Sequence, residues 1–291
     1  MLTIFTPAYN RAYTLDRLYK SLCEQTDRNF EWLIVDDGSK DDTKELVARW
    51  IKEKRINIRY YYQENSGKPS AHNKGADLAK GELFVCVDSD DLLRSDAVEQ
   101  IHTKAKELAE GLIGIISYKC DIKTKENITK LADETVQCAS LKDLYDYHGL
   151  TGDTMLTFKT EIIRKYSFPT FEGEKFIPEG YLYDLIDKEG ELLVLREALY
   201  GCEYMSDGYT AGMARLLYNN PKGYFTYINN RLKGDTSLKH KFLDCVRYDA
   251  MAIAHGGKGM FKRAVYPFMA VAAYPLGYAF YWKRYREYTR K

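Results

Sequence analysis

The stretch LFVCVDSDDLL, residues 83–93, changes abruptly from apolar to acidic. Its apolar start predicts a short buried strand, and Asp88, Asp90 and Asp91 follow at once. Carboxylates ~4 Å apart repel each other by about 1 kcal/mol even in water. Hard divalent cations such as Mg²⁺ and Mn²⁺ favour oxygen ligands, so a metal would turn this repulsion into attraction. The structural alternative is a helix N-terminus, whose dipole would favour Asp90 and Asp91.

Working outward, strand patterns alternate with helix patterns through the first 110 residues. Strands are predicted at residues 2–6, 30–35, 56–62 and 83–87, and helices follow each of them, the last over about 95–110. The inward faces of three of these helices are predicted to consist of Leu15, Leu18, Tyr19 and Leu22; Leu46, Val47, Trp50 and Ile51; and Val98, Ile101, Ala105 and Leu108. Strands joined through helices require crossover connections, so the pattern predicts an α/β fold with a mostly parallel sheet.

Three of the predicted strand ends carry unusual residues. They are Pro7-Ala8-Tyr9, Asp36-Asp37 and the acidic run 88–91. In an open α/β sheet the ligand binds outside the carboxyl ends of the strands, so these residues are expected to share one site. Neither G-x-G-x-x-G nor G-x-x-x-x-G-K-[ST] is present, which disfavours an ordinary dehydrogenase and a P-loop nucleotidase. A nucleotide remains the natural ligand for the crevice.

Charge is distributed unevenly along the 291 residues, although the formal net charge is only +1. Residues 258–291 carry a local +7, and the preceding part of the chain carries −6. A basic tail on an acidic body is not the pattern of a nucleic-acid binder, whose basic stripe crosses the folded domain. No secretory signal and no C-x-x-C is recognised, and the six cysteines are scattered, so a reduced, cytoplasmic setting is expected.

Within the basic tail, Ala264 to Trp282 forms a run of nineteen residues without a charge. Such a run reaches the ~18 residues of a membrane-spanning helix. However, Pro267, Pro275 and several tyrosines favour an interfacial or re-entrant helix pair on an anionic membrane surface. A core helix packed on the catalytic domain is the alternative.

Five short motifs follow one another in the first 95 residues: 6–11 (TPAYNR), 30–39 (FEWLIVDDGS), 65–67 (NSG), 80–82 (KGE) and 87–91 (VDSDD). Together they resemble the family-2 glycosyltransferases, which are nucleotide-sugar-dependent, inverting enzymes of the GT-A fold. Residues 178–183 (PEGYLY), 203–204 (EY) and 207–210 (DGYT) resemble bacterial members that build capsular or other surface polysaccharides. The resemblance implies a catalytic domain over 1–210, with a nucleotide-sugar half at about 1–118 and an acceptor half at about 119–210. A helical region would follow over 211–291, with the membrane-associating segment at 258–291.

The resemblance also implies roles for single residues. A UDP-sugar would be the donor, with the ring N–H of its uracil donating to Asp37, while Asp36 would be a turn residue. Asp90 would ligate Mn²⁺ or Mg²⁺, and Asp88 would contact the ribose or the metal. The other donor-binding residues would be Pro7, Ala8 and Tyr9 at the base and ribose, Asn65 and Asn73 near the nucleotide, Lys68 near the diphosphate, and Ser89 between the two aspartates.

An inverting transfer also needs a base that takes the proton of the acceptor hydroxyl. Family members often carry a Glu-Asp pair at the start of a helix, and here that place reads Pro178-Glu179-Gly180, so Glu179 is the candidate catalytic residue. Glu174 and Asp184 are the fallbacks. His240 and His255 could approach the metal or be ordinary surface or packing residues.

These expectations combine into transfer of one sugar, with inversion, from a UDP-sugar to a saccharide linked to polyprenyl diphosphate. The protein would work as a peripheral protein on the inner face of the cell membrane. Two alternatives stay open: a nucleotidyltransferase, which also holds a nucleotide with paired carboxylates, and a non-catalytic saccharide-binding scaffold.

Overall fold

The computed structural model describes residues 1–203 and 209–289 and divides into two compact units. Unit 1 comprises Met1–Ser167 and Asp184–Glu203, and unit 2 comprises Phe168–Tyr183 and Tyr204–Lys291. Residues 168–183 belong to the acceptor half of the domain predicted by sequence. In the structure they group with the C-terminal helices.

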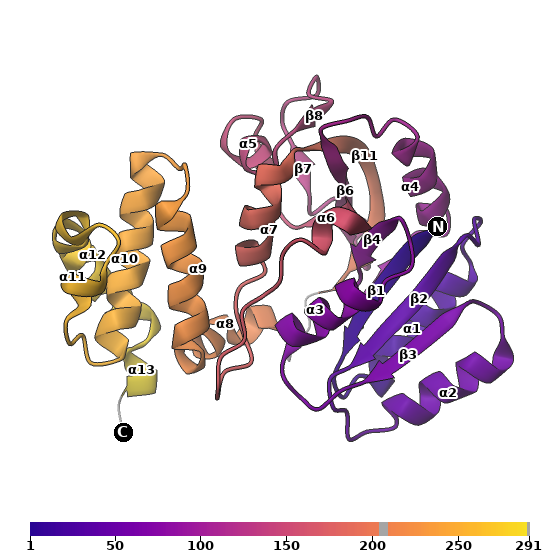
Figure 1. Ribbon diagram of the computed structural model, residues 1–291, viewed down its shortest axis with the longest axis horizontal. Coiled ribbons are helices and arrows are strands. Elements are labelled where there is room, and N and C mark those ends of the chain that lie inside the picture. The colour runs from indigo at the N-terminus through magenta and orange to yellow at the C-terminus, as the bar shows by residue number, and fades with distance from the viewer. Residues whose placement is uncertain (204–208, 290–291) are drawn as a thin grey trace. The chain divides into compact units, whose positions relative to one another are not determined.

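The first half of unit 1 is a parallel sheet with helical crossovers (Figure 1). Its strands follow the order β3-β2-β1-β4. Their bounds are β1 (Leu2–Ala8), β2 (Phe30–Asp36), β3 (Ile58–Tyr62) and β4 (Leu83–Cys86). All four lie where the sequence predicts them, and their parallel pairing is confirmed.

The sheet then continues with strands that the sequence does not reveal. Strand β10 (Thr154–Lys159) lies antiparallel between β4 and β6 (Leu112–Asp121), and β11 (Glu191–Cys202) runs parallel to β6. Short strands β5 (Leu92–Leu93) and β8 (Cys138–Ala139) pair antiparallel with β11. A separate pair is formed by β7 (Lys130–Leu131) and β9 (Leu150–Thr151).

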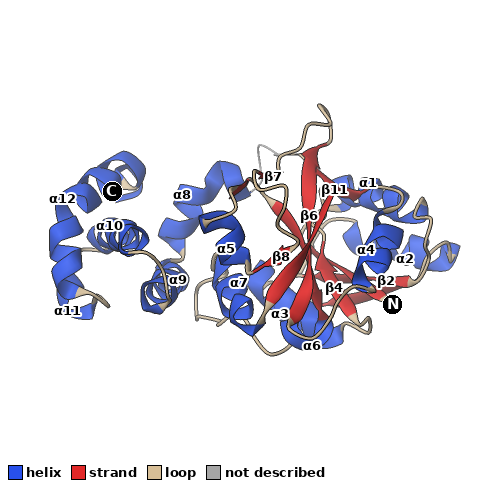
Figure 2. Cartoon of the chain, turned by 90° about the horizontal axis from the view of Figure 1, so that it is seen from above, coloured by secondary structure: helices blue, strands red, loops and turns tan. Residues whose placement is uncertain are grey.

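Helices cover both faces of the parallel strands (Figure 2). One face packs on α1 (Ala12–Cys23), α2 (Thr43–Glu53) and α4 (Ala97–Ala105), because alternate strand residues such as Ile4 and Trp32 join the core that these helices line. The opposite face packs on α3 (Lys68–Leu78), where a Cβ at Gly75 would come within 2.4 Å of the Phe5 ring. The shorter helices of unit 1 are α5 (Leu141–Asp146), α6 (Thr160–Ile163) and a 3₁₀ turn (Asp187–Glu189). Helix α7 (Gly180–Ile186) begins in unit 2 and ends in unit 1.

The predicted helix faces are correct except at Ile51, and one helix ends earlier than predicted. The four inward residues of α1 are buried, as are Val47, Trp50, Val98 and Ile101. Ile51 is 41% exposed, so its inward prediction is wrong; it lies past the stripe that Val47 and Trp50 turn toward the sheet. Helix α4 ends at Ala105 rather than near 110, because the chain leaves the helix in turns before Gly111, whose φ is +85°.

Unit 2 is built from helices around an apolar core that includes Ile228, Met251 and Tyr285. The helices are α8 (Tyr209–Asn219), α9 (Pro221–Lys233), α10 (Leu238–Ala254), α11 (Met260–Arg263), α12 (Pro267–Arg284) and α13 (Arg286–Thr289). The uncharged run forms the single helix α12, with Pro275 inside it, so the expected helix pair is wrong. None of the helices within the described ranges is long and apolar enough to cross a membrane.

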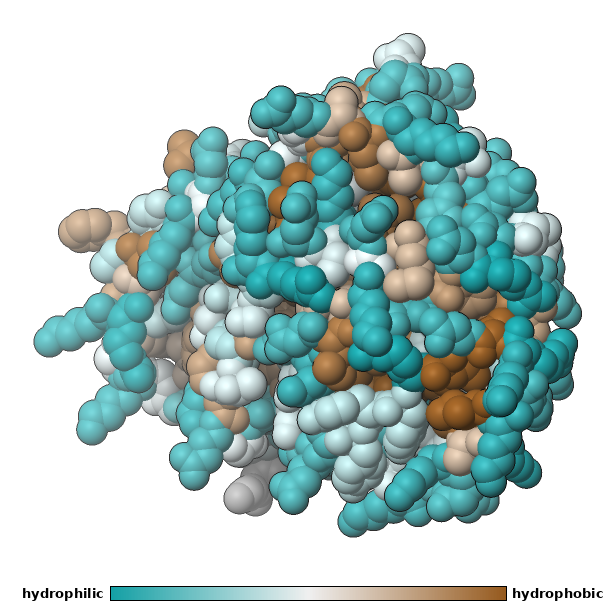
Figure 3. Space-filling model, turned by 45° about the vertical axis from the view of Figure 1, so that its right-hand side comes forward, coloured by the Kyte–Doolittle hydropathy of each residue, from teal (hydrophilic) through white to brown (hydrophobic). Residues whose placement is uncertain are grey.

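Figure 3 shows a mostly hydrophilic face with small hydrophobic areas between polar and charged side chains. Such a surface is typical of a globular chain in which 29% of the residues are charged. Many large apolar side chains are buried instead in apolar clusters, among them one in each unit.

Candidate active site

The carboxyl ends of β2, β1 and β4 meet at one edge of the sheet. Ala8 pairs with Asp36 in register, and the Asp37 N–H donates to the Ala8 carbonyl at 2.8 Å. On the other side of β1, the Val87 N–H donates to the Phe5 carbonyl at 2.8 Å. The three strand ends singled out by sequence are therefore neighbours, as the fold requires.

Asp36 and Asp37 have different partners. Asp36 is fully buried, and its carboxylate accepts from the Ser39 N–H at 2.7 Å and from the Tyr60 hydroxyl at 2.5 Å. Asp36 thus holds the turn after β2, which is the role predicted for it. The Asp37 carboxylate accepts from the backbone of Ser66 at 2.8 Å and of Gly67 at 2.7 Å, and from Gln63 Nε2 at 2.7 Å.

Asp37 therefore fastens the loop that contains Asn65 to the end of β2. Gly38 supports this contact, because its φ is +84° and a Cβ there would lie 2.8 Å from the Asn65 nitrogen. A carboxylate offers about four acceptor positions, so three protein bonds leave capacity for a ligand N–H. Beside this loop, Tyr9 is 45% exposed while Ala8 is buried, which leaves the tyrosine ring free to stack on a planar ligand.

Lys68 and Asp88 form an ion pair, with 2.6 Å between the lysine Nζ and the aspartate Oδ1. Lys68 comes from the first turn of α3, and Asp88 follows β4. Two residues predicted for the diphosphate and for the metal or ribose are thus in contact. The pair is only partly shielded from solvent, with side-chain exposures of 20% and 36%, so a ligand can reach it.

Tyr200, a buried residue of β11, fixes the shape of the acidic turn. Its hydroxyl donates to Asp91 Oδ2 at 2.6 Å and accepts from the Asp88 N–H at 2.9 Å. One side chain therefore ties together both ends of the segment from Asp88 to Asp91. We name this arrangement the Tyr200 strap. It leaves Ser89 buried and Asp90 half-buried between its two anchors.

Burial and mutual repulsion separate the pKa values of the three acids. Burial raises the pKa of Asp91 to about 7, with a further contribution from the charge of Asp88. Burial and Asp88 also raise the pKa of Asp90. Burial acts in the same direction on Asp88, but the ammonium groups of Lys68 and Lys119 outweigh it and lower its pKa. Asp88 is therefore the acid that the site keeps most firmly ionised.

Four residues around this cluster were missed by sequence reasoning. Lys119 lies over the Tyr200 ring, 4.0 Å from its centroid, and Arg17 donates to the Asp90 carbonyl. Arg11 acts on Asp88 and Asp90 through its charge. Lys119 and Tyr200 belong to β6 and β11, strands without a readable sequence pattern, so no local signal marks them.

The helix-terminus alternative for Asp90 and Asp91 is contradicted. Both residues precede strand β5, and the next helix, α4, begins only at Ala97. The acids therefore do not complement a helix dipole. Within the protein, Asp88 pairs instead with Lys68, and Asp91 accepts from the Tyr200 hydroxyl.

The candidate base Glu179 and its fallbacks, Glu174 and Asp184, differ in exposure and in hydrogen-bond partners. Glu179 is exposed in unit 2, and its carbonyl accepts from the backbone of Leu182 at 3.0 Å at the start of α7. The Glu174 carboxylate accepts from the Lys222 and Gly223 N–H groups at 3.0 and 2.9 Å, so it caps α9. Asp184 is half-buried on α7.

The remaining sequence candidates are also located. Asn73 lies half-buried on α3, and Pro7 is half-buried near the end of β1. His255 stacks on Tyr218, with 4.8 Å between ring centroids, and is a packing residue. The His240 N–H donates to the Ser237 hydroxyl at the start of α10. In the 203–210 motifs, Glu203 pairs with Arg17 at 3.0 Å and Lys123 at 2.6 Å, whereas residues 204–208 lie outside the described part of the chain.

The donor set suits a hard divalent cation that is held partly by its substrate. Asp88 and Asp90 supply carboxylate oxygens at the site, and Mg²⁺ or Mn²⁺ commonly takes one or two such ligands plus phosphate oxygens. In the described ranges no group of three or more His, Cys, Asp or Glu side chains is arranged to hold a metal by itself. The residues therefore fit a metal–diphosphate pair better than a protein-only metal centre.

The sequence of this chain matches the model of a known protein family. The model of "Glycosyl transferase family 2" matches residues 3–168, more than half of the chain. The chain belongs to this family. The sequence resemblance to family-2 glycosyltransferases is thereby confirmed.

Two proteins with glycosyltransferase names are similar to this chain over very different lengths. A Campylobacter jejuni protein, a GalNAc(5)-diNAcBac-PP-undecaprenol β-1,3-glucosyltransferase, is 25% identical over 91% of this chain and 85% of its own length. An uncharacterised glycosyltransferase of Rickettsia conorii is 42% identical over 34% of this chain. The matched segment spans only 16% of that relative's length.

Solved structures confirm the GT-A fold. TarS of S. aureus (residues 1–349), in complex with UDP-GlcNAc, superposes with a TM-score of 0.60 at 16% identity, covering 99% of this chain and 82% of the other. The mannosyltransferase of Pyrobaculum calidifontis, with GDP-Man and Mn²⁺, gives a TM-score of 0.55 at 19% identity, covering 96% and 73%. At these identities the likeness shows the fold alone.

Proposed function

We propose that the chain transfers a sugar from a UDP-sugar, with inversion, to a saccharide carried on a polyprenyl diphosphate. The observation that carries this proposal is the meeting of Asp37, Lys68, Asp88 and Asp90 at the carboxyl edge of the parallel strands. One end of this group suits a base N–H, and the other suits a diphosphate and a metal.

For the donor, Asp37 retains acceptor capacity for an imide N–H and Tyr9 offers an exposed ring for stacking. A carboxylate can accept the ring N–H of uracil, whereas cytosine offers no such N–H on its pairing edge, which supports UDP over CDP. The UDP-GlcNAc bound by TarS is consistent with this choice. GDP-Man in the Pyrobaculum enzyme shows that the fold also accepts another base, so the base is decided by local residues.

The diphosphate would lie against Lys68, Asp88 and Asp90. Lys68 neutralises Asp88 in the absence of donor, and a diphosphate offers the ammonium a stronger anionic partner. Asp88 and Asp90 would hold Mn²⁺ or Mg²⁺, which, when bound, neutralises charge that develops on the departing nucleoside diphosphate. The Tyr200 strap holds the Asp88 backbone and the Asp91 side chain, and so fixes beforehand the turn that carries Asp88 and Asp90, so little reorganisation is needed during transfer.

On the acceptor side, we assign the general base to Glu179. Glu179 is exposed at the start of α7, where an acceptor hydroxyl would approach its carboxylate from solvent. Removal of the hydroxyl proton on the face opposite the leaving group gives a single displacement, and therefore inversion. Glu174 is a poor substitute, because its two oxygens are already used at the α9 terminus.

The acceptor class rests on two further observations. The Campylobacter relative, which matches along 91% of this chain, is named for an undecaprenol-diphosphate substrate. Unit 2 also displays apolar and basic side chains suited to a membrane surface. We therefore place the protein at the cytoplasmic face of the bacterial membrane, in surface polysaccharide synthesis.

The test is release of UDP from a panel of UDP-sugars with undecaprenyl-diphosphate-linked saccharides, with Mn²⁺ or with chelator. We expect UDP release only with acceptor and metal, and a product whose anomeric configuration, read by NMR, is inverted. Glu179→Gln should abolish transfer while UDP binding persists. Release of inorganic diphosphate from a nucleoside triphosphate would instead indicate a nucleotidyltransferase. Saccharide binding without any turnover would indicate a scaffold.

A further inference from the structure

Helix α12 in unit 2 presents a large apolar face to solvent. Phe268 is 93% exposed, Val271 and Leu276 are each 54% exposed, and Trp282 is 55% exposed. We define the α12 face as the exposed large side chains of this helix: Phe268, Val271, Tyr274, Leu276, Tyr278 and Trp282. Contiguous exposed apolar patches of this kind mark interaction surfaces in soluble proteins.

Packing against α10 fixes which side of α12 faces outward. Ala270 and Ala273 are fully buried, and Gly277 is buried as well. A Cβ at Gly277 would lie 2.6 Å from the Cβ of Asp249 on α10, so only glycine permits this approach. The small residues therefore set the close contact with α10, and the large residues necessarily point away from it.

Basic residues border the α12 face at both ends. Lys258, Lys262 and Arg263 precede the helix, and Lys283, Arg284 and Arg286 end or follow it; Glu287 is the one acid among residues 258–289. Lys258, Lys262 and Lys283 form no ion pair within the described part of the chain. The Arg286 guanidinium lies 4.4 Å from the Trp282 ring centroid, which places a cation beside the last aromatic residue of the face.

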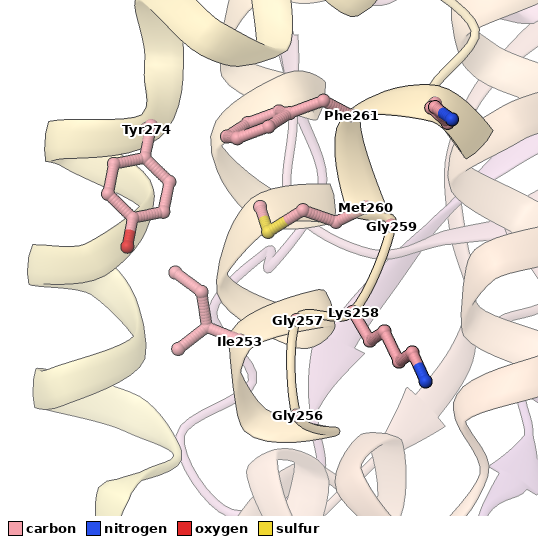
Figure 4. A pocket seen from close by; sticks show the side chains of 9 residues that line it. Ile253, Gly256, Gly257, Lys258, Gly259, Met260, Phe261 and Tyr274 are labelled. Atoms are coloured by element: carbon pink, nitrogen blue, oxygen red, sulfur yellow. The ribbon is translucent and has the colours of Figure 1, made fainter.

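A pocket adjoins the α12 face, and Figure 4 shows its lining. Ile253, Met260, Phe261 and Tyr274 surround an open volume of about 630 Å³, while the Lys258 side chain extends away from it. Phe261 and Tyr274 meet edge to face, with 5.8 Å between ring centroids. The pocket thus offers apolar side chains beside the α12 face, with Lys258 and Lys262 among its lining residues.

We infer that the α12 face and its basic border dock on an anionic lipid bilayer. Apolar side chains would enter the acyl boundary, Tyr and Trp would lie at headgroup level, and Lys and Arg would meet anionic headgroups. Charge decides against a second copy of this chain, because a symmetric contact would bring the same basic borders together. The helix lies on the surface in this arrangement, in agreement with the lack of a spanning helix in the described ranges.

The experiment is flotation of the full chain with vesicles of phosphatidylcholine, alone or mixed with phosphatidylglycerol. We expect binding to the mixed vesicles that weakens with added salt. Phe268→Ser combined with Leu276→Ser should lower vesicle affinity at least about tenfold, because two inserted side chains are lost. Leu238→Ser is the matched control, since Leu238 is 75% exposed at the start of α10 and lies outside the face.

A second pair of variants tests the basic border. Lys258→Gln with Lys262→Gln should weaken binding to phosphatidylglycerol vesicles several-fold. The control pair, Lys233→Gln with Lys239→Gln, removes the same charge elsewhere in unit 2 and should leave it unchanged. Absence of vesicle binding by the native chain, or unchanged binding by the Phe268/Leu276 variant, would overturn the inference. A dimer in sedimentation velocity that this variant dissociates, without vesicle binding, would assign the face to a second copy.

The inference rests on the proposed function, which supplies a lipid-linked acceptor, but the two can fail separately. Calorimetric UDP binding by the Phe268/Leu276 variant should equal that of the native chain. Vesicle binding without UDP binding would leave the docking surface intact and remove the proposed function. Sugar transfer from a UDP-sugar without vesicle binding would support the proposed function and remove the docking surface.

Discussion

Asp249 gives a prediction whose size can be worked from the structure. The side chain is fully buried on α10, and neither carboxylate oxygen has a hydrogen-bond partner among the described residues. Burial raises its pKa from an ordinary 3.8 to about 7. At about 1.4 kcal/mol for each pH unit, this difference corresponds to about 4 kcal/mol of unfolding free energy.

The sign follows from which state holds the proton. In the unfolded chain Asp249 ionises near pH 4, whereas in the folded chain it stays protonated until about pH 7. The stability that the neutral carboxyl contributes is therefore fully present below pH 4, falls as pH rises through this window, and is lost above pH 7. Asp249→Asn cannot ionise, so it should remove this slope and make unit 2 less dependent on pH.

The measurement is urea unfolding at a series of pH values, followed by hydrogen–deuterium exchange in peptides from α10 and α12. Such peptides report on unit 2 separately from unit 1. Between pH 4.5 and 7.5 the native chain should lose about 3 kcal/mol relative to Asp249→Asn, because part of the total of about 4 kcal/mol falls outside this window. All other titrating groups are common to both proteins, so the difference isolates Asp249.

Asp244 is the matched control on the same helix. It is also buried, but it pairs with Arg231 at 2.9 Å and with Arg247 at 2.5 Å. Asp244→Asn should therefore destabilise unit 2 by about 1.5–3 kcal/mol near neutral pH, because a buried carboxylate loses its charge-assisted hydrogen bonds to two arginines. Parallel pH curves for the native chain and Asp249→Asn would refute the reasoning.

Three further predictions concern unit 1. Tyr200→Phe removes the hydroxyl that joins Asp91 to the Asp88 backbone. This variant should lose about 3 kcal/mol of unfolding free energy and bind UDP more weakly. Unchanged UDP affinity would contradict the positioning role of Tyr200. Glu31→Ala removes a fully buried carboxylate that accepts hydrogen bonds from the Thr3 hydroxyl, the Arg59 guanidinium and the Lys80 N–H. Urea unfolding should therefore show a loss of about 3–5 kcal/mol in unfolding free energy. A loss below about 1 kcal/mol would refute this prediction. Lys68→Gln removes the ammonium group that lowers the pKa of Asp88, so carboxyl NMR should show that this pKa rises. The same variant should bind UDP about tenfold more weakly. The control Lys80→Gln should change neither the pKa of Asp88 nor the UDP affinity.

Much of the N-terminal fold is readable because each element there follows a local rule. Apolar runs end in polar strand ends, and Leu15, Leu18 and Leu22 repeat at helical spacing, so pairing and burial could be predicted. Asp37, Asp88 and Asp90 follow from the rule that parallel strands bring their carboxyl ends together, whereas Lys68 is indicated by the family resemblance alone. Ile51 marks the limit, because spacing identifies a helical face without showing how wide the contact with the sheet is.

The second half of unit 1 depends on tertiary context. Strand β10 enters the sheet antiparallel between β4 and β6, and nothing in residues 154–159 encodes those partners locally. Lys119 and Tyr200 reach the acidic turn from β6 and β11, more than 25 residues away in sequence, so they become visible only in three dimensions. Glu174 likewise reads as a candidate base until its bonds to the α9 terminus are known.

The central claim is that this sheet edge binds a nucleoside diphosphate through Asp90 and a divalent metal. The most direct measurement is calorimetric titration of UDP, with GDP and CDP as controls, in the presence and absence of Mn²⁺. We predict Mn²⁺-dependent binding of UDP in preference to the other nucleotides, lost in Asp90→Asn and retained in Asp96→Asn, which lies outside the acidic turn at the start of α4. Absence of binding of all three nucleotides, or equal UDP binding by the native chain and Asp90→Asn, would contradict the account.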